Sequence, residues 1–183
     1  MQPTTQTRRG RAADPCAVLA DIAARTAEPR PIAERARSVL AALRDLVPYE
    51  CAALSAWDPI SGVYRPVVNA GYSPPIFAAI HSELRRDEHA RLGLLDQPLT
   101  VRFRDLPGGG RDLTSYRVVA PAGFREGLGS ALFTRDGRHA GSLSLSTTNA
   151  RYPSARQRDL VALLAPTLAG ITDAVGAVCA RHG

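Results

Sequence analysis

The chain has 183 residues, of which 45% are apolar and 22% are charged, and these proportions are typical of an ordinary globular protein. This length suits one domain with extra terminal segments, which should bury about 70% of the surface of the unfolded chain. No apolar run approaches the roughly 18 residues of a membrane span. The Arg8-Arg9 pair lacks the apolar stretch that a secretion signal needs, so we expect a cytoplasmic protein without membrane binding.

The formal net charge of +6 is carried by arginine, because the chain has no lysine. Residues 1–13 form a polar tail with Arg8, Arg9 and Arg11 and no acid, and this composition predicts disorder. The remaining 20 of the 23 arginines are interspersed with 17 acidic residues, whereas a nucleic-acid-binding domain concentrates its positive charge on one face. The sequence therefore predicts no specific nucleic-acid binding.

Two helices are expected at the start of the chain. Asp14 can cap the first, Pro15–Ala27, because an aspartate followed by proline is a typical helix start. The second, Pro31–Val47, carries an apolar stripe with a period of 3.6 residues. The predicted organisation is a disordered basic tail (1–13), an N-terminal helix with its linker (14–30) and the main domain (31–183).

Strands and short helices follow. Cys51–Asp58 is predicted to be a strand buried on both faces, and Val63–Tyr72 an edge strand, because Pro66 lies inside it. The further expected elements are a polar helical stretch from Ile76 to about Arg91, a strand Leu99–Arg104, an irregular segment Asp105–Gly123 with one or two helical turns around Leu113–Val119, and a long helix that Ser154 caps.

A hairpin is predicted between the runs Leu128–Arg135 and Arg138–Ser146. Asp136-Gly137 between them is the usual pair for a two-residue type I′ turn. Since side chains alternate across a strand, one face is leucine-rich and the other has small hydroxyl residues around Phe133. This second face either leaves room for a ligand or packs closely under a helix. The expected pairs are Phe133 with Ala140, Ala131 with Ser142, Gly129 with Ser144, Leu132 with Gly141, Ser130 with Leu143, and Leu128 with Leu145.

The order of these elements resembles a GAF domain over about Ile32–Val175. In this order, the motifs are similar to the N-terminal sensor domains of actinobacterial regulators that carry a LuxR-type helix-turn-helix. The resemblance implies an α/β (α+β) fold, a GAF-like antiparallel sheet with the terminal helices on one face and a pocket with short helices and loops on the other. The motifs are Leu-Val-Pro-Tyr49, Ser55-Ala-Trp-Asp58, Asn69-Ala-Gly-Tyr-Ser73, Phe103-Arg-Asp-Leu-Pro107, Pro121-Ala-Gly-Phe-Arg-Glu-Gly127, Asp136-Gly-Arg-His-Ala-Gly-Ser-Leu-Ser-Leu-Ser146 and Leu164-Ala-Pro-Thr-Leu-Ala169.

The resemblance also implies a function. It suggests a regulatory domain in transcriptional or signalling control that senses a small molecule or contacts a protein. After Val175 the sequence leaves no room for a helix-turn-helix, so we expect no DNA-binding module, in either a shortened regulator or a stand-alone sensor. The alternative is a ligand-free dimerisation or interaction module. A cleft of roughly 300 Å³ or more favours a sensor, and a collapsed cleft favours the module.

Several side chains are candidates for binding a ligand. Tyr116 and Arg117, beside the irregular segment, could anchor an anionic or carbonyl ligand, or they could form the polar face of an amphipathic turn. Trp57 and Tyr72 could line the same cavity or fill the core. The predicted ligand-binding set is Trp57, Tyr72, Tyr116, Arg117, Phe133, Ser142 and Ser144.

Neither catalytic residues nor metal ligands are expected. No Ser-His-Asp ordering or paired carboxylate stands out, and Cys16, Cys51 and Cys179 show no metal-ligand spacing.

The resemblance to GAF domains raises three further possibilities: an attached bilin, redox-active cysteines and a bound haem. Bilin attachment would need a cysteine in the helical region, and none lies between Cys51 and Cys179. Redox chemistry of the methionine sulfoxide reductase type would need two reactive cysteines, whereas burial would raise the pKa of Cys51. Haem would need a pocket histidine, which His81 or His89 could supply. We predict a protein without a cofactor, with a haem- or redox-sensing domain as a lesser alternative.

The last helix suggests an assembly. Leu168, Ile171, Val175 and Val178 keep three- and four-residue steps beyond the expected end of the core, and would be exposed in a monomer. Such spacing suits helix–helix packing and predicts a two-fold homodimer through the terminal helices. The alternative is that Pro15–Ala27 folds back and covers the stripe. A regulatory protein is a further possible partner.

Overall fold

The computed structural model describes residues 14–173. The helices are α1 (Pro15–Ala27), α2 (Ile32–Leu46), α3 (Pro74–Ile80), α4 (Glu83–Arg91), α5 (Thr114–Val119) and α6 (Ala155–Thr172). The strands are β1 (Cys51–Asp58), β2 (Val63–Ala70), β3 (Thr100–Arg102), β4 (Glu126–Phe133) and β5 (His139–Thr147), and short 3₁₀ turns, including Phe103–Asp105, fill the segment between β3 and β4.

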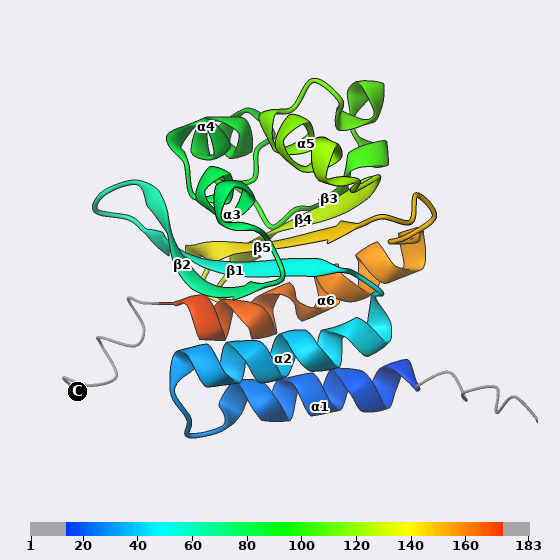
Figure 1. Cartoon of the computed structure of the whole chain (residues 1–183). Coiled ribbons are helices and arrows are strands. Elements are labelled where there is room, and N and C mark those ends of the chain that lie inside the picture. The colour runs from blue at the N-terminus through cyan, green and yellow to red at the C-terminus, as the bar shows by residue number, and fades with distance from the viewer. Residues whose placement is uncertain (1–13, 174–183) are drawn as a thin grey trace, which may run out of the picture.

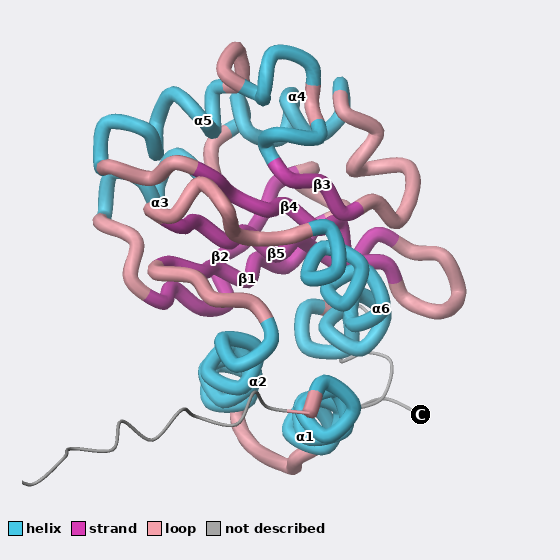
Figure 2. The backbone as a smooth tube through the Cα atoms, turned by 90° about the vertical axis from the view of Figure 1, so that its right-hand side faces the viewer, coloured by secondary structure: helices cyan, strands magenta, loops and turns pink. Residues whose placement is uncertain are grey.

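These elements form three layers around an antiparallel sheet with the strand order β2-β1-β5-β4-β3. Helices α1, α2 and α6 lie on one face, and α3, α4 and α5 with their loops lie on the other (Figure 1). Figure 2, turned by 90°, shows α1 beneath both α2 and α6. The predicted fold class is confirmed, and so are the central hairpin and the edge position of the strand that contains Pro66.

The face under the terminal helices is an apolar core. Leu128, Leu132, Leu143 and Leu145 of the hairpin all belong to it, each with at most 3% of its surface exposed. This confirms the predicted leucine-rich face. Helix α6 covers this core and begins with a capping box, in which the Ser154 hydroxyl accepts a hydrogen bond from the backbone N–H of Gln157.

The hairpin turn corrects one prediction. Among the described residues only glycines have a positive φ, so Asp136 cannot take the first position of a type I′ turn. Instead, the N–H of Gly137 donates to the Thr134 carbonyl at 3.0 Å, and the N–H of Thr134 donates to the Arg138 carbonyl at 2.9 Å. This is a three-residue loop, in which a type I turn is followed by a left-handed glycine with φ of 85°.

The longer loop changes the pairing at the end of the hairpin. Phe133 pairs with His139, and the predicted pairing with Ala140 is wrong. An irregularity between Leu132 and Phe133 then shifts the register by one residue, so that Leu132 pairs with Gly141 as predicted. The remaining predicted pairs are confirmed, and every side chain beyond the bulge therefore lies on its expected face.

The polar stretch predicted from Ile76 to about Arg91 is two helices, which is a second correction. Helix α3 ends at Ile80, and Ser82 caps α4 by accepting a hydrogen bond from the backbone N–H of Arg85 at 3.3 Å. A serine side chain competes for backbone donors and thereby favours a new helix start. In the second helix the side chains of Arg85 and Glu88 are buried, with 11% and 1% of their surface exposed.

The stripe on α6 is a third correction. Leu168 is fully buried and Ile171 is 3% exposed, because both belong to the core that α6 forms with the sheet and the other terminal helices, including the fully buried Ile22 of α1. These two residues are therefore buried within a single chain and are not exposed as the sequence analysis expects. Val175 and Val178 lie outside the described residues, as does the predicted tail (1–13), and the homodimer stays a prediction. Within residues 14–173, no helix is long and apolar enough to cross a membrane.

Candidate ligand-binding site

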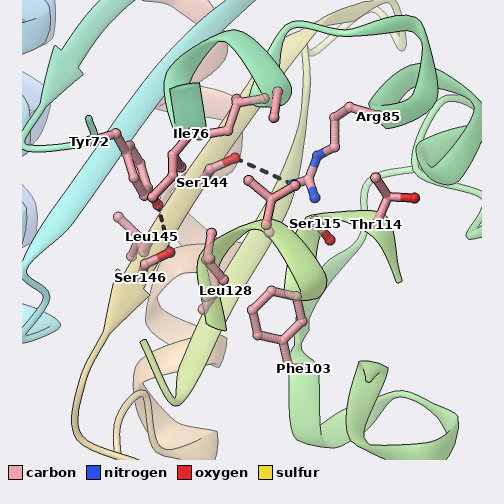
Figure 3. Close-up of a pocket in the computed structure, with 15 residues that line it drawn as sticks. Tyr72, Ile76, Arg85, Phe103, Thr114, Ser115, Leu128, Ser144, Leu145 and Ser146 are labelled. Carbon is pink, nitrogen blue, oxygen red and sulfur yellow. Dashed lines mark hydrogen bonds between the residues drawn. The ribbon is translucent and has the colours of Figure 1, made fainter. Parts of the chain in front are cut away.

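A cavity of about 50 Å³ lies between the sheet and the layer of α3, α4 and α5. Its walls combine aliphatic side chains with hydroxyl groups and one charged side chain, Arg85 (Figure 3). The lining residues are Tyr72, Ile76, Ala79, Ile80, Arg85, Phe103, Thr114, Ser115, Val118, Val119, Leu128, Gly129, Ser144, Leu145 and Ser146.

The floor of the cavity is the central strand β5. Ser142, Ser144 and Ser146 alternate with Leu143 and Leu145, and the leucines belong to the core on the opposite face. The alternation therefore directs the three hydroxyls toward α3–α5, as the sequence predicts. Ser144 and Ser146 line the cavity, whereas Ser142 lies further along the strand.

One end of the cavity is closed by Tyr72. The Asn69 side chain accepts a hydrogen bond from the Tyr72 N–H at 3.0 Å and donates to the Tyr72 carbonyl at 2.9 Å, which holds the turn after β2. Gly71 has φ of 100° in this turn, and a Cβ there would lie 3.1 Å from the Cys51 sulfur. The Tyr72 hydroxyl and the Ser146 hydroxyl are 2.8 Å apart (Figure 3), and burial raises the pKa of Tyr72.

The other end of the cavity is formed by Arg85, whose side chain is only 11% exposed. Its Nη1 donates to Glu88 at 3.0 Å, and its Nη2 lies 3.4 Å from the Ser144 hydroxyl, a long and weak contact. Its Nε is buried and has no hydrogen-bond partner among the described residues. Arg85 thus keeps donor capacity beside the cavity.

Glu88 fixes this end of the site to α5. Its side chain is 1% exposed and accepts hydrogen bonds from the Ser115 hydroxyl at 2.5 Å and the Ser115 N–H at 3.1 Å. The carboxylate therefore neutralises Arg85 and satisfies backbone and side-chain donors in the first turn of α5. One ion pair thereby joins α4, α5 and, through Ser144, the central strand.

Sequence reasoning missed Arg85 and Glu88. Helix α4 buries Glu88 and His89, whereas Leu84 is 63% exposed. This pattern is the reverse of an amphipathic helix, so the apolar periodicity gives no indication of which charges face inward. The only local signal is the spacing of Arg85 and Glu88, which can form an ion pair on one helix face.

The predicted ligand-binding residues fall into four groups. Tyr72 and Ser144 line the cavity. Trp57 and Phe133 lie together elsewhere, with ring contacts to His139 at 5.3 and 4.9 Å. Ser142 is buried opposite Ser55 on β1 and Ala131 on β4. Tyr116 packs edge-on against Phe103, and the side chain of Arg117 is 69% exposed beside Asp112 at 3.5 Å.

A second polar cluster lies beside the site. The Tyr64 hydroxyl is 2.8 Å from His89 Nδ1 and 3.1 Å from His139 Nε2. Burial lowers the pKa of His139 to about 4, and burial together with Arg85 and His139 lowers that of His89 well below its usual value. The cluster therefore holds neutral imidazoles at neutral pH.

Neither candidate haem ligand fits that role. His81 Nδ1 donates to the Phe77 carbonyl at 2.8 Å, so its Nε2 accepts from the Ser55 hydroxyl at 3.0 Å. His89 lines a cavity of about 20 Å³, which is room for one or two water molecules and far too small for a porphyrin.

Other reactive groups are also enclosed. Ser55 lies beside a histidine, but it is 1% exposed, and the far nitrogen of His81 binds a backbone carbonyl rather than a carboxylate. Burial raises the pKa of the Cys51 thiol, as expected from the sequence. Among residues 14–173, no group of three or more His, Cys, Asp or Glu side chains is placed to hold a metal ion.

Comparison with solved structures identifies the fold. The phycoerythrobilin-bound GAF domain of a cyanobacterial phytochrome has a TM-score of 0.66 at 14% identity, over 94% of this chain and all of that one. The GAF domain of Acinetobacter phosphoenolpyruvate-protein phosphotransferase has a TM-score of 0.64 at 12% identity, over 91% and 97% of the two chains. The A. aeolicus NLH2 GAF domain in an inactive state scores 0.59 at 12% identity, over 86% and 94%.

The chain therefore has the GAF fold, which the sequence motifs predict. No family model matches the sequence, and no curated protein matches it either. The finer resemblance to the sensor domains of LuxR-type regulators stays a prediction.

Proposed function

We propose that this domain is a cytoplasmic regulatory sensor that binds a small molecule between β5 and the α3–α5 layer, in transcriptional or signalling control. The observation that carries the proposal is the buried Arg85, which has an Nε without a partner among the described residues and lines a cavity with otherwise uncharged walls. Buried sites of this kind, mostly apolar with a few polar groups, are typical of small-molecule binding. Because Arg85 is joined to α4, α5 and β5, a ligand there would act on three elements at once.

The proposed site binds without catalysing a reaction. Of the hydroxyls at the cavity, those of Tyr72 and Ser146 contact each other, that of Ser144 contacts Arg85 and that of Ser115 donates to Glu88. The Ser–His contact at Ser55 is buried away from the cavity. Bilin is not a suitable ligand, because a cavity of about 50 Å³ holds only a small fraction of such a molecule.

The test is native mass spectrometry of freshly purified protein, followed by a thermal-shift screen of small metabolites. A retained or stabilising molecule is expected to lose its effect in Ala79→Leu, since Ala79 lines the cavity and the larger side chain fills it. Ala78→Leu, at an exposed position on the same helix, is the matched control. A molecule that stabilises Ala79→Leu as much as the parent protein would place binding elsewhere.

The second candidate function is a ligand-free dimerisation or interaction module. The small volume favours it, because about 50 Å³ is below the roughly 300 Å³ at the lower end of ligand pockets. Under this alternative, no screened molecule would stabilise the protein, and Ala79→Leu would leave the function of the domain unchanged while filling an empty space.

A further inference from the structure

We infer that the cavity selects a small, electrically neutral molecule with a carbonyl-type oxygen, such as an amide, ketone or lactone, and that Arg85 donates to that oxygen. This inference rests on the proposed sensor function and specifies the ligand class for the same site. It follows from three properties of the site: its spare donors, its charge balance and its size.

The donors of Arg85 require an acceptor. A guanidinium has five N–H groups; here one is used fully by Glu88 and one weakly by Ser144. The buried Nε has no partner within the described part of the chain. A buried donor without a partner is costly, so an oxygen acceptor in the cavity would be bound favourably. An entirely apolar ligand would leave the cost in place.

The charge balance favours a neutral acceptor over an anion. Glu88 already neutralises Arg85, and it is held there by both the N–H and the hydroxyl of Ser115. Among the described residues that line the cavity, only Arg85 carries a charge. A carboxylate would therefore bring a second negative charge into a buried site whose single cation is already paired, and burial of an uncompensated charge is costly. A carbonyl oxygen accepts the same hydrogen bond without that cost.

The apolar walls and the size limit the rest of the molecule. Ile76, Ile80, Phe103 and Val118 surround the space between Arg85 and the Tyr72–Ser146 pair. In Figure 3, Arg85 and Tyr72 lie at opposite ends of the site, with Ser144 between them. About 50 Å³ is room for roughly three to five water-sized groups. A short aliphatic chain with one carbonyl fits the site without displacement of its walls.

The experiment uses propionamide and propionate, which share one skeleton and differ in charge. Each is titrated at neutral pH and millimolar concentration into ¹⁵N-labelled full-length protein, and binding is followed by amide chemical shifts. We expect saturable shifts around Ser144, Ser146 and Ser115 with propionamide, and at least about tenfold weaker binding of propionate. Propionate that binds as tightly as propionamide, or more tightly, overturns the inference.

A double variant and a matched control test whether Arg85 binds the probe. The double variant Arg85→Gln with Glu88→Gln removes the ion pair without leaving a lone charge, and it should weaken propionamide binding at least about tenfold. Arg86→Gln, the next residue, whose side chain is 35% exposed, is the control and should bind normally. If the double variant does not fold, Ala79→Leu fills the cavity while keeping every charge, and should abolish the shifts. Unchanged binding in the folded double variant overturns the role of Arg85, and unchanged binding in Ala79→Leu overturns the assignment of the ligand to this cavity.

The outcomes separate this inference from the sensor function. If neither probe gives saturable shifts, the carbonyl preference is wrong, while a different molecule retained in native mass spectrometry would still support a sensor. If a retained molecule is an anion that needs Arg85, the ligand class is overturned and the site remains. Retention of an uncharged carbonyl compound that is lost in the double variant supports both.

Discussion

The two faces of the sheet are buried by different means. Under α1, α2 and α6 the contacts are almost entirely aliphatic, with Leu40, Leu43, Leu143 and Leu168 at most 1% exposed. Under α3, α4 and α5 the buried groups include Glu88, His89 and several serine hydroxyls, and cavities remain between them. The first face gains stability from apolar area, which is non-directional, whereas the second depends on a few exact pairings of polar groups.

This difference suggests that the two helical layers have different roles. A close-packed apolar core transmits strain but offers no room for a ligand. A layer held by paired polar groups can exchange one partner for another at small net cost, because a hydrogen bond lost to the protein is regained with the ligand. The helices α3–α5 are therefore the part of the fold best suited to respond to a small molecule, and the terminal helices the part that holds the sheet in place.

The largest effect is expected at the ion pair on the polar face. Glu88→Ala leaves Arg85 buried without its partner, and removal of one member of a buried pair costs about 3–5 kcal/mol. Replacement of both members, Arg85→Met with Glu88→Leu, should cost much less, because no lone charge remains. Urea unfolding measures both. Equal losses in the two variants would show that packing, not charge, dominates this face.

The apolar face is tested by Leu143→Ala. Leu143 is fully buried on the central strand beneath the terminal helices, so truncation should lower the free energy of unfolding by about 2–5 kcal/mol. Leu84→Ala on α4 is the control, because Leu84 is 63% exposed and surface substitutions usually change stability by less than about 0.5 kcal/mol. A loss below about 1 kcal/mol for Leu143→Ala would contradict the importance of this core.

A third test uses acid pH, which should affect the polar face selectively. Burial lowers the pKa of His139 to about 4, below the value of roughly 6.5 in an unfolded chain. The unfolded state therefore binds more protons between these values, and the stability that is fully present above about pH 6.5 is lost as the pH falls toward 4. His81 and His89 change in the same direction.

The variant His139→Gln measures this contribution. It should remove up to about 1.4 kcal/mol per pH unit from the slope of unfolding free energy between pH 6 and 4.5. Asp58 and Asp105 have pKa values lowered to about 2 by hydrogen bonds from Ser61 and Arg102. Their contributions are lost mainly below pH 4 and leave the measured window largely unaffected. An unchanged slope in His139→Gln would mean that the pKa of this imidazole is the same in the folded and unfolded protein.

Much of the fold could be predicted because its signals are local. Asp14 and Pro15 mark the start of α1, and the serine–leucine alternation of β5 sets both faces of the central strand. Most of the predicted hairpin register is confirmed although the predicted turn type is wrong, because the bulge beside Phe133 compensates for the extra loop residue. Such compensation is invisible in a sequence, because it depends on the geometry of both strands together.

The candidate site could be predicted only in part. Ser144 followed from strand alternation, whereas Tyr72 was named as an aromatic residue that could line the cavity or fill the core, and both line the cavity. Arg85 was missed because tertiary packing, not helix periodicity, decides which face of α4 is buried. The burial of Leu168 was missed for a related reason, since a stripe on α6 does not reveal which elements pack against it.

The smallest effect is expected at Arg117, which the sequence suggested as a ligand anchor. Its side chain is 69% exposed and lies 3.5 Å from Asp112, itself 94% exposed, and exposed ion pairs contribute about 0–1 kcal/mol. Arg117→Ala should therefore change the unfolding free energy by less than about 0.5 kcal/mol and leave propionamide binding unchanged.

Tyr72→Phe is compared with Arg117→Ala, because Tyr72 lines the cavity. It removes the hydroxyl that contacts Ser146 at the closed end of the cavity, which should cost about 1 kcal/mol and alter the amide shifts of β5. Urea unfolding and the same titration measure both variants. Weakened binding in Arg117→Ala together with normal binding in Tyr72→Phe would move the site from the buried face of the α3–α5 layer to its outer surface.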